Sequence, residues 1–76
     1  MSTKRLTITV YGLGRHGNDA ASVERSLARQ PGVLHAAVNP STEIAYVAYD
    51  PALCDAAALV AAIRRAGFGA GPPIER

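Results

Sequence analysis

The chain has 76 residues, of which 49% are hydrophobic and 18% are charged, and its formal net charge is +2. This length allows one small folded domain, and the composition excludes a disordered or collagen-like chain. The basic residues are scattered, no apolar run approaches the ~20 residues that span a bilayer, and the first residues contain no signal-peptide core. We therefore expect a cytoplasmic protein that contacts neither nucleic acid nor the membrane interior.

The first half of the chain is predicted to form a strand, a loop and a helix. From Leu6 to Tyr11, apolar and polar residues alternate with the period of two that is typical of a strand with one buried face. A glycine-rich loop follows, and apolar residues then recur three and four positions apart, as in an amphipathic helix. Asn18 or Asp19 can cap this helix, and Pro31–Gly32 ends it.

The second half is predicted to form a hairpin, a helix and a last strand. The runs Val33–Val38 and Glu43–Tyr49 are rich in strand-forming residues, and a turn-forming segment that contains Pro40 separates them. Asp55 can cap the second helix, and Gly67 can end it in a left-handed conformation.

Phe68–Gly71 is predicted to be a short last strand, which Pro72 and Pro73 confine to a sheet edge. The resulting order, βαββαβ, predicts an α+β, ferredoxin-like fold: a four-stranded antiparallel sheet with two helices on one face. We expect the domain to cover residues 1–71, with 72–76 as a C-terminal tail or the start of a linker. The predicted core comprises Leu6, Ile8, Val10, Val23, Leu27, Ala36, Val38, Ala45, Val47, Leu59 and Ile63. The uncovered face should carry Thr9, Tyr11, His35, Ile44 and Tyr46.

Two ligand-binding signatures are incomplete in this sequence. Gly12, Gly14 and Gly17 have the spacing of a dinucleotide-binding loop, but no acidic residue follows at the end of the second strand. An RNA-recognition motif has the same order of elements, but the strands lack its stacking aromatic residues. No nucleophile has an identifiable base partner, so the sequence does not predict an enzyme.

A set of motifs in a fixed order resembles the heavy-metal-associated (HMA) domain of metallochaperones and metal-transporting P-type ATPases. The motifs are Val10-x-Gly12-Leu13, Val23-Glu24-x-x-Leu27, Pro31-Gly32-Val33, Tyr49-Asp50-Pro51 and Ala66-Gly67-Phe68-Gly69-Ala70. In that family the loop after the first strand reads Gly-Met-x-Cys-x-x-Cys, and its two thiolates hold Cu(I), Zn(II) or a similar soft ion. Here Gly12 and Leu13 take the places of glycine and methionine, and no cysteine follows.

The resemblance implies two alternative pairs at the positions of the missing cysteines. If the family pattern is aligned from Leu27 backwards, with one residue inserted in this chain, the two cysteine positions fall on His16 and Asp19. If it is aligned from Gly12 forwards, they fall on Arg15 and Asn18. We take His16 and Asp19 as the metal candidates, because imidazole and carboxylate bind divalent transition metals such as Zn, Ni, Co or Cu. Two ligands give only weak binding unless a partner adds more, and tight Cu(I) binding is not expected without thiolates.

The structural alternative for this pair is an exposed loop histidine and a helix cap. Leu13, Arg15 and Phe68 are the predicted partner-binding residues. Cys54, the only cysteine, precedes the second helix at the end opposite the loop, where we expect it to be buried as a packing residue.

The resemblance implies a function in metal-ion binding or transport. The domain would be metallochaperone-like or an N-terminal module of a metal-transporting ATPase, and its partner would be another protein or an adjacent transporter domain. The alternative is a metal-independent protein-docking or regulatory domain on the same scaffold.

Overall fold

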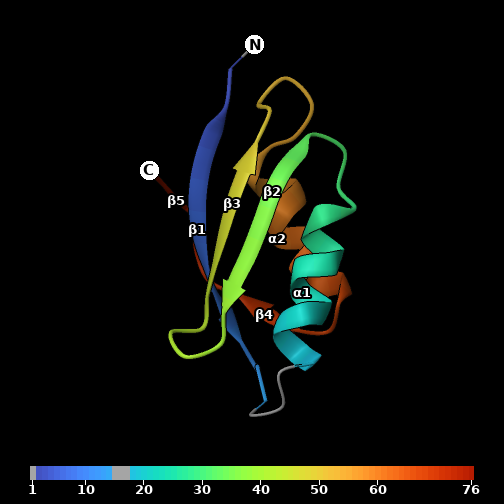
Figure 1. The fold of residues 1–76 in the computed structure, drawn as a ribbon, viewed down its shortest axis with the longest axis vertical. Coiled ribbons are helices and arrows are strands. Elements are labelled where there is room, and N and C mark those ends of the chain that lie inside the picture. The colour runs from blue at the N-terminus through green and yellow to red at the C-terminus, as the bar shows by residue number, and fades with distance from the viewer. Residues whose placement is uncertain (1, 15–17) are drawn as a thin grey trace.

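The computed structural model describes residues 2–14 and 18–76, which form an antiparallel sheet with both helices packed against one face (Figure 1). The elements are β1 (Lys4–Tyr11), α1 (Asn18–Ala28), β2 (Val33–Asn39), β3 (Ile44–Tyr49), α2 (Ala56–Arg65), β4 (Gly69–Ala70) and β5 (Ile74–Glu75). The strands lie in the order β2-β3-β1-β4, and β5 also pairs with β1. The predicted ferredoxin-like α+β fold is confirmed.

The strand register determines which side chains form the core. In the central β1–β3 pair, Leu6 lies opposite Val47 and Ile8 lies opposite Ala45, so these side chains share the face that the helices cover. The buried side chains of α1 and α2, including Leu27 and Leu59, pack onto this face. The predicted core residues are buried except for Ala36, which is partly buried, and the core also contains Ala20, Tyr49, Cys54 and Ala62.

Both predicted boundaries of α2 are confirmed. The Asp55 side chain caps the helix by accepting a hydrogen bond from the Ala58 amide at 2.8 Å. At the other end Gly67 has φ +98°, its amide donates to Arg64 O, and the Phe68 amide donates to Ile63 O. This pair of bonds is a Schellman motif, which satisfies carbonyl groups that the helix leaves free.

The edge of β1 carries two short strands instead of the one predicted. β4 pairs with Val10 and Tyr11, and β5 pairs with Leu6 and Thr7. The two prolines between β4 and β5 have no amide hydrogen, so the ladder is interrupted there and resumes at Ile74. The domain division after residue 71 stays a prediction, although the short strand β5 lies within the sheet.

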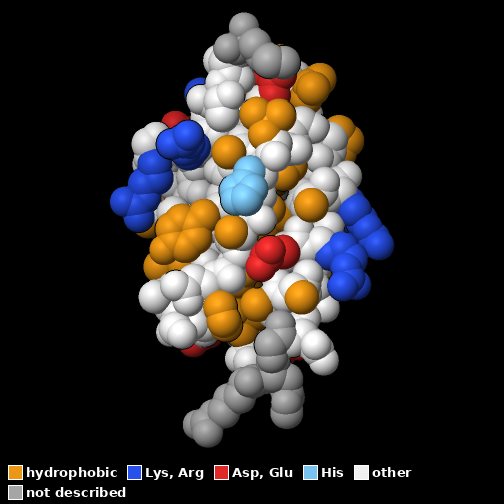
Figure 2. Space-filling view, in the orientation of Figure 1, with side chains coloured by type: hydrophobic (Ala, Val, Ile, Leu, Met, Phe, Trp, Pro, Cys, Tyr) orange, Lys and Arg blue, Asp and Glu red, His pale blue; other side chains and the backbone are white. Residues whose placement is uncertain are grey.

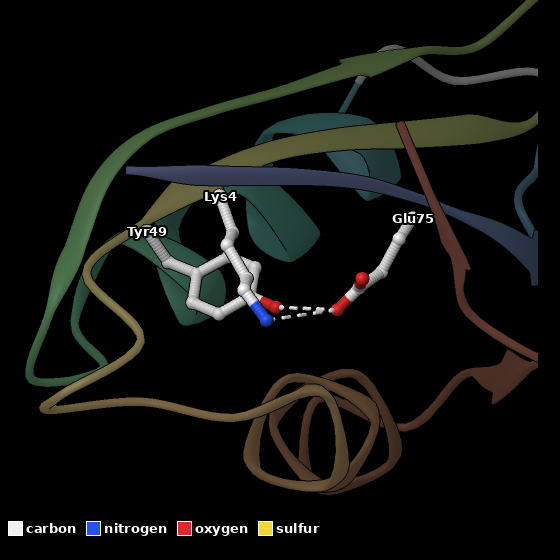
Figure 3. Close-up of polar contacts among 3 residues, drawn as sticks. All are labelled: Lys4, Tyr49 and Glu75. Carbon is white, nitrogen blue, oxygen red and sulfur yellow. Dashed lines mark hydrogen bonds and ion pairs between the residues drawn. The ribbon is translucent and has the colours of Figure 1, made fainter. Parts of the chain in front are cut away.

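A polar cluster lies where β5 meets the ends of β1 and β3 (Figure 3). Glu75 Oε1 accepts a hydrogen bond from Tyr49 Oη at 3.4 Å and lies 3.8 Å from Lys4 Nζ. Burial raises the pKa of Tyr49, and the neighbouring Glu75 carboxylate raises it further. The phenol therefore stays protonated and keeps its role as hydrogen-bond donor.

Candidate functional site

The loop after β1 rests on partly buried apolar side chains. The Leu13 and Phe68 side chains both pack against the core. A Cβ atom built at Gly12, which has φ +94°, would lie 3.9 Å from Phe68 Cδ1, so the Phe68 ring lies directly beside the start of the loop. The predicted partner residues Leu13 and Phe68 are therefore close to the loop, while Arg15 lies outside the described residues.

Asp19 connects the first turn of α1 to the loop. Its Oδ2 atom accepts a hydrogen bond from the Gly14 amide at 2.6 Å. We expected Asn18 or Asp19 to precede the helix as its cap, but α1 includes both residues. The carboxylate lies in the first turn, where the helix dipole favours a negative charge, and it holds a loop amide. Nothing in the sequence indicated the Gly14 amide as its partner.

Among the described residues around the loop, Asp19 at the start of α1 supplies one oxygen ligand, and they form no complete metal site. A carboxylate that accepts one hydrogen bond retains lone pairs for a cation, so Asp19 remains able to coordinate. Its predicted companion His16 lies outside the described residues. Within residues 2–14 and 18–76, no three His, Cys, Asp or Glu side chains form a group that could hold a metal ion.

Cys54 lies far from this loop. Its side chain is 8% exposed, just before α2, and the β3–α2 connection is at the opposite end of the sheet from the β1–α1 loop (Figure 1). Burial raises the pKa of the Cys54 thiol, and the Asp55 charge adds to this effect. The predicted burial of Cys54 is confirmed.

We expect Cys54 in the folded protein to react with a disulfide reagent at least about tenfold more slowly than in the unfolded chain, because the thiol is buried and its pKa is raised. The rate should increase with pH as the thiolate forms. Absorbance at pH 7 and pH 8, with a sample in guanidinium chloride as the control, measures both effects. Equal rates in the folded and unfolded samples would contradict this burial.

Comparison with known proteins identifies the family. Residues 17–69 match the model of the heavy-metal-associated domain. The chain belongs to this family. It is 42% identical over 66 residues to the probable copper-transporting ATPase PacS of Synechococcus elongatus, a match that covers 87% of this chain and 9% of the ATPase. It is also 45% identical over 49 residues to a copper-exporting P-type ATPase of Bacillus subtilis, covering 64% of this chain and 6% of that protein.

Solved HMA structures have the same architecture. A crystal structure of a copper binding domain from HMA7, a P-type ATPase, superposes with a TM-score of 0.86 at 29% identity and covers 90% of both chains. The N-terminal soluble domains of Bacillus subtilis CopA superpose with a TM-score of 0.83 at 37% identity, over 90% of this chain and 46% of that one. The described helices of this HMA domain include none that is long and apolar enough to cross a membrane.

Proposed function

We propose that this HMA domain serves metal-ion transport by holding a divalent transition metal weakly at the β1–α1 loop. His16 and Asp19 would supply the first ligands, and a partner protein or an adjacent transporter domain would supply the others. The observation that carries this proposal is the Asp19 carboxylate, which is turned onto the loop and hydrogen-bonded to Gly14. Family membership and the copper-transporting relatives support the metal-transport part of this proposal.

The ligand types favour a divalent ion. Imidazole suits Zn, Ni, Co and Cu(II), and a carboxylate oxygen is a harder ligand that Cu(I) does not prefer. The only cysteine is buried at the other end of the sheet, so a single copy of this chain offers no thiolate to the loop. We therefore propose a cytoplasmic, non-catalytic module that receives or passes on a metal ion together with its partner.

Protein docking without metal is the second candidate. It is favoured by the same lack of thiolates, and by Leu13 and Phe68, which are only partly buried beside the loop and so present apolar surface to a partner. Arg15 would add a positive charge to this contact.

Titration with Zn(II), Ni(II) or Cu(II) tests the proposed metal site. We expect amide NMR changes from Gly14 to Ala20, and we expect them to disappear in His16→Ala and in Asp19→Ala. The response should also weaken as pH falls through the histidine range, because a protonated imidazole cannot coordinate.

The Asp19→Asn variant separates coordination from loop structure. An asparagine can still accept the Gly14 hydrogen bond through its amide oxygen, but it lacks the negative charge that attracts a cation. The metal-free loop spectrum should therefore resemble the original, while the metal response is lost. His35→Ala, at an exposed position in β2, is the control that should leave the response unchanged. If a large excess of each ion leaves the loop unperturbed, docking without metal replaces this proposal.

A further inference from the structure

The sheet face that the helices leave uncovered contains a groove. In the view of Figure 2, hydrophobic side chains lie over the strands with a histidine and an acidic side chain among them, and Lys and Arg side chains lie at both margins. A hollow of about 490 Å³ opens on this face. Its lining includes Arg5, Thr7, His35, Tyr46, Ala48 and Arg76. The volume lies within the range of roughly 300–1,000 Å³ that is typical of ligand pockets.

The strand register explains the hollow. Ala48 on β3 lies opposite Arg5 on one side and His35 on the other, so a methyl group stands between two long side chains. In the next row Thr7 lies opposite Tyr46, whose side chain is 43% exposed and forms a wall of the groove. Side chains opposite each other in antiparallel strands point to the same face, so these residues enclose one space.

The charged side chains that line the groove are two arginines. Its lining includes the side chains of Arg5, Arg76, His35 and Tyr46 and, among the described residues, no Asp or Glu side chain. The Arg76 amide donates to Arg5 O at 2.9 Å, which holds the two arginines next to each other. Glu75 is engaged elsewhere, with Lys4 and Tyr49. Two arginines that line one apolar hollow suit a ligand that carries both carboxylates and an apolar side chain.

We propose that this groove docks an acidic peptide segment of a partner protein. A leucine-like or aromatic side chain of the segment would occupy the hollow over Ala48, and flanking carboxylates would pair with Arg5 and Arg76. A second copy of this chain fits less well, because it would bring the same arginines against each other. The site is separate from the β1–α1 loop, so it does not depend on metal binding.

Three blocked hexapeptides test the proposal: one alternates glutamate and leucine, one has lysine in place of glutamate, and one has serine in place of leucine. The glutamate–leucine peptide should shift the amides of residues 5–7 and 46–48, and its affinity should fall as salt concentration rises. We expect the other two peptides to bind at least about tenfold more weakly, a difference of about 1.4 kcal/mol in binding free energy. The lysine peptide lacks the carboxylates for the arginines, and the serine peptide lacks the apolar side chain for the hollow.

Two variants locate the contact. Ala48→Leu fills the hollow and should weaken the glutamate–leucine peptide by about tenfold or more, while Arg5→Gln should weaken it by about three- to fivefold, as expected for an exposed ion pair. Arg64→Gln, an exposed arginine on α2, is the matched control and should not change the affinity. A melting curve checks that the Ala48→Leu variant is folded. If Ala48→Leu does not fold, Arg5→Gln still tests the contact.

Three results would overturn the proposal. The first is that the lysine peptide binds as tightly as the glutamate–leucine peptide. The second is that neither Arg5→Gln nor Ala48→Leu weakens binding of the glutamate–leucine peptide. Sedimentation could also show a dimer whose formation shifts the same amides, which would make this face a contact between copies.

Discussion

Replacing Gly32 by alanine is expected to destabilise the domain by about 3 kcal/mol, the sum of a backbone cost and an overpacking cost. Gly32 has φ +90°, a conformation that side-chain-bearing residues rarely adopt. A Cβ atom there would lie 2.7 Å from Leu53 Cβ and 3.2 Å from the Leu53 carbonyl carbon. The segment it would strike is anchored, because Asp50 N donates to Gly32 O at 2.7 Å.

Gly67→Ala is the matched control for this prediction. Gly67 also has positive φ, at +98°, but a Cβ atom there would meet nothing within 4 Å. We therefore expect it to cost only about 1 kcal/mol, from the backbone conformation alone. Urea unfolding at pH 7 measures both free energies. Equal losses at the two positions would show that the Leu53 contact does not restrict Gly32.

Installing two cysteines at the positions that the family resemblance assigns to metal ligands is expected to create tight Cu(I) binding. In a Cys54→Ser background, the double substitution His16→Cys and Asp19→Cys should raise Cu(I) affinity by more than about a thousandfold, which is about 4 kcal/mol, because two soft thiolates then share one loop. The parent chain should not compete with a moderate Cu(I) chelator such as bicinchoninate, and absorbance of the copper–chelator complex reports the competition.

The second possible register provides the comparison. Arg15→Cys with Asn18→Cys, in the same background, places the pair one position earlier and should gain much less affinity. If this variant binds Cu(I) more tightly than the first, the ligand positions are Arg15 and Asn18. His16 and Asp19 would then lose their support as the metal pair.

The sequence predicts most of this fold because burial and caps leave local signals. Alternation from Leu6 indicated β1, but the strand begins at Lys4, since exposed charged residues can extend a ladder without showing any pattern. The turn before β3 also ends later than expected, because Glu43 has φ +59° and stands outside the strand. Pairing after the two prolines left no local signal, so β5 was missed.

The candidate site is harder to predict, because it depends on where one side chain turns. Asp19 looked like a helix cap, since aspartate before an apolar periodic segment usually is one. The structure instead gives its carboxylate a partner five residues earlier, the Gly14 amide. Every residue except proline carries a backbone N–H group, so residue types alone cannot reveal which amide Asp19 binds. Burial of Cys54 was predictable because a free cysteine usually packs as a small hydrophobic residue, and the order of elements placed it at the end opposite the loop.

The position of β5 also determines how this domain can be tethered. Glu75 pairs with Leu6, so the chain returns to the end of the sheet where β1 begins, and the β1–α1 loop lies at the far end (Figure 1). A flexible segment joined at either end would therefore leave from the same pole. The β1–α1 loop would then lie at the end of the domain that is farthest from the tether. The length of the tether would set the volume within which this loop can reach a partner.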